Sequence, residues 1–100
     1  MAAVVSTLRF KEPVDRALFV ESERELADAM RAIDGFQGFH VVHTAETEVV
    51  LVILADTVEV LDQLATEVGS PWMLANVVPL LASPPDRHVG EVIASATART

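Results

Sequence analysis

The sequence has 100 residues, of which 51% are apolar, and its formal net charge of −8 comes from 15 acidic against 7 basic residues. A chain of this length and hydropathy forms one folded domain, residues 1–100 with an ordered core over about residues 3–96, which excludes a disordered protein. An acidic surface repels phosphate groups and the basic residues are scattered, so nucleic acids and anionic membranes are excluded as partners.

Features that the sequence lacks point to the cytoplasm. No stretch approaches the roughly 20 apolar residues of a membrane helix, and residues 1–6 lack the basic and apolar regions of a signal peptide. The chain has no cysteine, which excludes disulfides, a thiolate nucleophile and cysteine-based metal sites. We therefore expect a cytoplasmic protein.

The first third of the chain predicts a strand followed by a helix. Residues 4–10 are rich in β-branched side chains and predict the strand, which Pro13 ends because proline has no N–H for a ladder. Asp15 can cap a helix whose apolar residues recur every three or four positions, and Gly35 is its expected stop. A capping-box pattern at residues 22–25 leaves open a later start.

The middle of the chain predicts a hairpin. Residues 38–44 and residues 48–55 both read as strands, and a polar turn of three residues separates them. Two strands with so short a connection pair in antiparallel fashion.

The second half predicts two helices and a last strand. The helix that begins near Asp56 is expected to stop at Gly69. A short second helix then begins with Ser70 as N-cap and Pro71 at the first helical position, until Pro79 disturbs it. The last strand is expected over residues 87–96, and the final four residues are expected to fray.

This order, β-α-β-β-α-α-β, predicts an α+β protein with a ferredoxin-like arrangement: a four-stranded antiparallel sheet with helices on one face. Such a sheet should alternate apolar and polar residues, yet residues 49–55 are apolar at every position. Leaving three or four of these side chains in water would cost several kcal/mol. A second copy is the expected cover, which makes the protein a homodimer; a long loop over the strand is the alternative.

Four segments carry a resemblance to a known family. They are LRFKEP, GFQGFHVV, ADTVEVLDQLATEVGSPW, and the PLL segment that leads through SPP into the last strand. Together they resemble the dimeric α+β barrel superfamily, in particular the antibiotic biosynthesis monooxygenase-like domains. The resemblance implies a cavity between helices and sheet, with Trp72 and Asn76 on its wall. The family that the chain resembles also contains haem-degrading enzymes. Those enzymes have a histidine near the position of Asn76 and an asparagine on the first strand, where this chain has Ser6-Thr7-Leu8, so haem degradation is not expected.

The activity that the resemblance implies is a monooxygenase without metal, flavin or other cofactor, acting on a small hydrophobic aromatic compound of the polyketide type. A phenol would be deprotonated, and the resulting carbanion would react directly with dioxygen. The candidate catalytic residues are His40, Asn76 and Arg9, and the candidate substrate-binding residues are Trp72, Met73 and His43. The alternatives are a non-catalytic dimer that binds a ligand or another protein, and an amino-acid-sensing regulatory domain.

Each candidate also has a purely structural interpretation. His40 and His43 are three apart on a strand and therefore face opposite sides, so no metal site is expected there. Arg9 can pair with an acidic residue of a neighbouring strand, and Trp72 can close the core. Arg87 and His88 can hold an acidic or phenolic group, or form only a solvated strand start.

Overall fold

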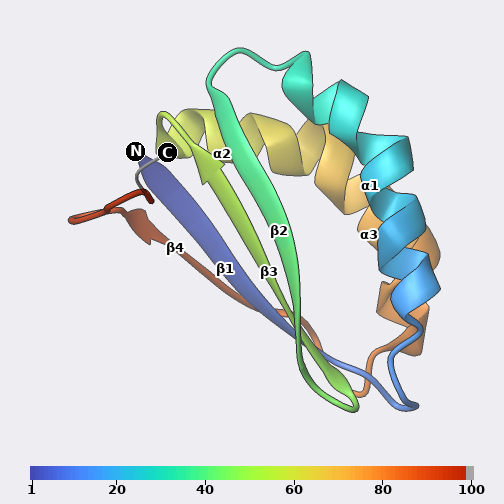
Figure 1. Cartoon of the computed structure of the whole chain (residues 1–100). Helices are drawn as coiled ribbons and strands as arrows, with labels where there is room; N and C mark the ends of the chain where they lie inside the picture. Colours follow the sequence, from blue (N-terminus) through green and yellow to red (C-terminus); the bar gives the residue numbers. More distant parts are fainter. Residues whose placement is uncertain (99–100) are drawn as a thin grey trace.

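The structure is a computed structural model that describes residues 1–98. Its strands are β1 (Ala2–Arg9), β2 (Phe36–Ala45), β3 (Glu48–Ala55) and β4 (Asp86–Glu91). Its helices are α1 (Arg16–Arg31), α2 (Val58–Leu64), the π-helical turn η1 (Ala65–Gly69), α3 (Ser70–Asn76) and the 3₁₀ turn η2 (Val78–Leu80). The sheet has the order β2-β3-β1-β4 with every neighbouring pair antiparallel, and all helices lie on one of its faces (Figure 1). The ferredoxin-like α+β fold predicted from the sequence is confirmed.

The core lies between the sheet and the helices, and side-chain alternation places it there. Along β1, every second residue from Ala2 to Leu8 is buried beneath the helices. Along β3, Val49, Leu51 and Ala55 do the same. The intervening residues face away from the helices, and Val5 on that open face is 42% exposed. No helix within residues 1–98 is long and apolar enough to cross a membrane.

The start of α1 follows the sequence prediction, but its end comes earlier than predicted. The Asp15 carboxylate accepts a hydrogen bond from the Ala17 amide at 3.0 Å, so Asp15 is the N-cap and the later start is wrong. The helix ends at Arg31 with Ala32 as its C-cap, so Gly35 is not the helix stop. Gly35 lies in the turn before β2 with a φ of +95°, in the left-handed region that only glycine adopts freely. A Cβ there would lie 2.9 Å from the Cγ2 atom of Val60, so space as well as backbone conformation requires glycine.

The second helical region departs from the prediction. Gly69 does not stop a helix: its φ of −70° and ψ of −53° are helical, and α2, η1 and α3 run on without a break. The Ser70 amide donates to the Ala65 carbonyl five residues back, which makes the turn a π-turn. Pro71 explains the widening, because its ring has no N–H to offer and would press on the carbonyl four residues back in a regular helix. Thr57, and not Asp56, is the N-cap of α2.

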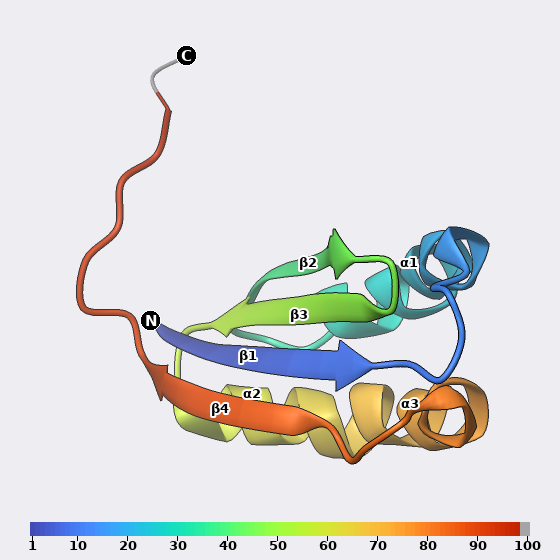
Figure 2. The same ribbon diagram turned by 90° about the horizontal axis from the view of Figure 1, so that it is seen from below.

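The last strand is shorter than predicted. It ends at Glu91, and residues 92–98 leave the sheet in an extended path (Figure 2). The pairing register gives the reason, because Glu91 lies opposite Ala2, where β1 begins, and no neighbouring strand remains beyond that point. Of the four residues expected to fray, residues 99–100 lie outside the described residues.

Candidate functional site

A cavity of about 430 Å³ lies between the sheet and the helical segment η1–α3. β1 and β3 form its floor, the π-turn and α3 form its wall, and the approach to β4 closes one end. The lining residues are Val4, Ser6, Leu51, Ile53, Ala65, Gly69, Ser70, Met73, Leu74, Val78, Pro85 and Arg87. A volume of this size is typical of small-molecule sites.

Local structure explains why the cavity is open. Val4 and Ser6 of β1 point to the helix side because strand side chains alternate. Above them the wall carries two small residues, Ala65 and Gly69, within the widened π-turn. A Cβ at Gly69 would meet only the Leu64 carbonyl oxygen, at 3.7 Å, so the missing side chain leaves free space.

Three polar residues, Ser6, Ser70 and Arg87, line this largely apolar cavity, and two of them, Ser6 and Arg87, come from the sheet. Ser6 and Arg87 lie directly opposite each other on β1 and β4, so they share the helix-facing side of the sheet. Ser6 is only 7% exposed, and its hydroxyl forms no hydrogen bond with any of residues 1–98. Arg87 forms no ion pair within the same described part of the chain. Both groups are therefore free to bind a ligand.

The charge of Arg87 is not neutralised by the carboxylate next to it. Asp86 lies on the open face, where its Oδ1 atom is 3.0 Å from Nε2 of His88. The cavity therefore keeps a positive charge at one end and an apolar surface over the rest. Such a distribution suits a flat apolar molecule with one acidic oxygen.

Several solved structures have the same fold as this chain. A protein of unknown function from Nitrosomonas europaea superposes with a TM-score of 0.78 at 19% identity, over 99% of this chain and 95% of that one. A second protein from that organism, provisionally assigned as an antibiotic biosynthesis monooxygenase, gives 0.75 at 16% identity over 94% and 100%. SnoaB, a cofactor-independent oxygenase from Streptomyces nogalater, gives 0.71 at 12% identity over 94% of each chain.

The chain shares the fold of these three proteins. This confirms the resemblance inferred from the four sequence segments. The sequence itself matches no family model and no curated protein. At these identities the likeness establishes the architecture alone, and the site must be argued from its own residues.

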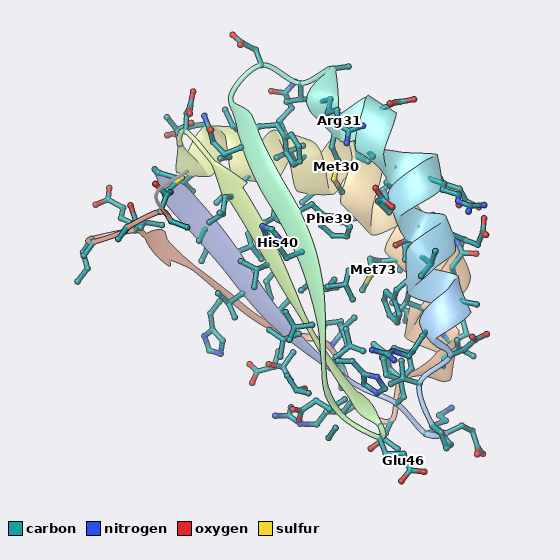
Figure 3. All side chains as sticks on the ribbon, in the orientation of Figure 1. Met30, Arg31, Phe39, His40, Glu46 and Met73 are labelled. Atoms are coloured by element: carbon teal, nitrogen blue, oxygen red, sulfur yellow. The ribbon has the colours of Figure 1, made fainter. Side chains whose placement is uncertain are left out.

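Within this monooxygenase-like fold, Met73 is the one of the six sequence candidates that lines the cavity. Figure 3 shows Met73 and Phe39 both pointing into the space between the helices and the sheet. Trp72 and Asn76, which the resemblance placed on the wall, are not among the lining residues. They contact each other instead, because Nδ2 of Asn76 donates to the Trp72 carbonyl at 3.0 Å.

The remaining candidates lie on three different parts of the molecule. His40 is opposite Val52 on the open face of the sheet, whereas His43 is opposite Val49 on the helix face, so the predicted opposition of the two histidines is confirmed. Arg9 lies at the end of β1, with its Nε atom 3.6 Å from a carboxylate oxygen of Glu48. Arg9 therefore forms the ion pair with a neighbouring strand that was its structural interpretation.

His43 lines a second cavity of about 320 Å³, between α1 and the outer strand β2. Its wall also carries Arg16 and Glu23, so this space is more polar than the first. The sequence candidates are thus not gathered into one site by the fold. Ser6 was missed, although a hydroxyl on the otherwise apolar helix-facing side of β1 was a signal. Arg87 was noted only together with His88, which lies on the open face.

Proposed function

We propose that the chain is a cofactor-independent monooxygenase that oxidises a small phenolic aromatic compound in the cavity beneath η1 and α3. The observation that carries the proposal is the pairing of the Ser6 hydroxyl with the Arg87 guanidinium, neither of them bonded to a side chain of residues 1–98, in a largely apolar cavity of about 430 Å³. The cavity suits a substrate of two or three fused rings. The fold shared with SnoaB, a cofactor-independent oxygenase, supports the same reaction class.

Arg87 supplies the electrostatic part of the mechanism. A guanidinium beside a phenol stabilises the phenolate and lowers the pKa of the bound phenol, so the proton can pass to solvent without a base on the wall. Ser6 donates a second hydrogen bond to the same oxygen. The apolar remainder of the cavity contacts the rings, so a bound substrate displaces water from around both interactions and strengthens them.

The reaction then needs only dioxygen. One electron passes from the phenolate to dioxygen, and the two radicals combine at the ring carbon para to the oxygen. Protonation gives a ring hydroperoxide, and loss of water from it leaves a quinone carbonyl. One dioxygen is consumed and one water released for each ring oxidised.

We infer further that the working unit is a homodimer that joins at the open face of the sheet. That face carries Val5 and Val42, which are 42% and 46% exposed, beside the half-buried Val50, Val52 and Leu54. A contiguous apolar patch of this kind is a feature of interfaces. A second copy buries it with the same residues on both sides, as a two-fold axis requires.

Oxygen uptake with a dihydroxynaphthalene tests the proposed activity. We expect one dioxygen consumed per quinone formed, and we expect Arg87→Met to reduce ligand affinity or turnover about tenfold to hundredfold, because hydrogen bonds to charged groups are the strong ones. Arg24→Met is the matched control, since Arg24 is an exposed arginine of α1 that does not line the cavity, and it should leave both quantities unchanged.

The second candidate function is ligand binding without catalysis. It is favoured by the lining of the cavity, where no carboxylate or imidazole of the described residues could act as a base. Saturable binding that depends on Arg87, with oxygen uptake no faster than in buffer, would support it over the enzyme. Neither binding nor uptake would overturn both.

A further inference from the structure

One oxidisable side chain lies on the cavity wall. Of the chain's three methionines, Met73 lines the cavity beneath η1 and α3, whereas Met1 lies ahead of β1 and Met30 is only 2% exposed in a separate core cluster. The other lining residues of the described chain are aliphatic, serine or arginine, and none is a cysteine, histidine, tyrosine or tryptophan. Met73 is therefore the lining side chain that readily takes up an oxygen atom.

The backbone holds Met73 in place while its side chain stays adaptable. Its carbonyl accepts a hydrogen bond from the Val77 amide at 2.9 Å, and Val77 is 0% exposed in the core cluster against which Met73 packs. The Met73 side chain is half-buried and points into the space between the helices and the sheet (Figure 3). A thioether on three rotatable bonds adapts to the shape of its neighbours, so the sulfur can contact a bound ring without a change in the backbone.

The proposed binding mode directs the reacting carbon toward Met73. Ser6 and Arg87 would hold the phenolate oxygen at the sheet. The para carbon is at the opposite end of the ring, away from both groups, where the lining comes from α3 and η2 and consists of Met73, Leu74 and Val78. A hydroperoxide formed on this carbon therefore shares the cavity with one thioether and with aliphatic groups that do not react with it.

We propose that Met73 is a self-oxidation site, whose thioether takes the outer oxygen of the ring hydroperoxide and becomes a sulfoxide. The inference rests on the proposed function, which supplies the hydroperoxide. A sulfur lone pair attacks the outer peroxide oxygen, the O–O bond breaks, and the hydroperoxide proton passes to the inner oxygen. The ring hydroperoxide becomes a ring alcohol, and the sulfur loses the two electrons that the peroxide gains.

The sulfoxide limits further turnover. It places a polar, chiral group in a lining that is otherwise largely apolar, so the bound ring loses an apolar contact. Loss of water from the hydroperoxide instead gives the quinone and leaves Met73 intact, so the two fates compete in each turnover. The oxidised fraction of Met73 therefore rises with the number of turnovers, and a methionine sulfoxide reductase reverses the change.

Cumene hydroperoxide, an apolar aromatic hydroperoxide, tests the site without turnover. We expect peptide mass spectrometry to show Met73 oxidised at least about tenfold faster than N-acetylmethionine amide in the same solution, because binding makes the oxygen transfer intramolecular. Met30 should stay unmodified because it is buried. Hydrogen peroxide, which the apolar lining does not hold, should oxidise Met73 no faster than the reference compound. Equal relative rates with the two peroxides overturn the inference.

The loss of activity is followed by oxygen uptake with a dihydroxynaphthalene, with catalase present to remove free hydrogen peroxide. The wild-type rate should fall in proportion to the oxidised fraction of Met73, and methionine sulfoxide reductase should restore it. Met73→Leu has no sulfur at the site, so its uptake should hold at its own initial rate while substrate is in excess. Met30→Leu, the same change in the core, is the matched control and should decline as the wild type does.

The outcomes separate this inference from the proposed function. Uptake that proceeds while Met73 stays unmodified, or that declines equally in Met73→Leu, overturns the self-oxidation and leaves the monooxygenase standing. Uptake no faster than in buffer overturns both.

Discussion

Trp72 joins α3 to α1 through one hydrogen bond and one aromatic contact. Its Nε1 atom donates to Oε2 of Glu25 at 2.8 Å, and its ring centroid is 6.5 Å from that of Phe19. We expect Trp72→Phe to lower the free energy of unfolding by about 1 kcal/mol, because the donor is lost while most of the apolar volume remains. Urea unfolding followed by far-ultraviolet circular dichroism measures this.

The same variant separates a packing role from a substrate-binding role for Trp72. Because Trp72 is not on the cavity wall, ligand affinity should stay within about twofold of the wild type. Glu25→Gln keeps an acceptor oxygen and should cost less stability than Trp72→Phe. A large loss of ligand affinity in Trp72→Phe, with stability unchanged, would return Trp72 to the site.

Two glycines, one in the π-turn and one in the turn after α1, differ in whether a side chain can replace them. Gly69 has helical dihedral angles and room for a Cβ, so Gly69→Ala should raise stability by about 0.5–1 kcal/mol. Gly35 has a φ of +95° and no room, so Gly35→Ala should lower it by about 1–2 kcal/mol. Urea midpoints of the two variants measure both effects, and equal signs would contradict the comparison.

Gly69→Ala also probes the cavity. The added methyl group enters the wall beside Ser70, so a stabilised protein should bind a dihydroxynaphthalene more weakly than the wild type does. An unchanged affinity would place the ligand away from the π-turn.

How far the sequence specifies this molecule differs between local and long-range features. The N-cap at Asp15 and the hairpin at residues 46–47 follow from local chemistry and were predicted. The end of β4 depends on where β1 begins, which is a fact of pairing register. The continuity of α2 with α3 depends on a π-turn. Gly69 and Pro71 are residues typical of helix boundaries, and they therefore predicted a break between two helices at this point.

The candidate site was harder to predict, because it is assembled from residues distant in sequence. Ser6 and Arg87 meet only through strand pairing, and neither is unusual in its local context. Asn76 and Trp72 have the residue types of a site, but the rotation of α3 directs them elsewhere. Sequence chemistry identifies reactive side chains, whereas the fold decides which of them share a cavity.

For the whole molecule, the apolar open face implies that a single copy is incomplete. We expect Val5→Glu to weaken the dimer at least about a hundredfold, because the two-fold axis brings two buried carboxylates into an apolar interface of an already acidic protein. Sedimentation velocity over a dilution series measures the constant. Val20→Glu on α1 is the control, and a wild-type protein that is monomeric at micromolar concentration would contradict the proposed interface.

The register at the start of β1 has a practical consequence for anyone who prepares this protein. Residues fused ahead of Met1, as in an affinity tag, would prolong β1 and give residues 92–98 a neighbour within their own subunit. The sheet would then be longer at this end, so amides 93–98 should exchange more slowly in the tagged protein than after the tag is cleaved.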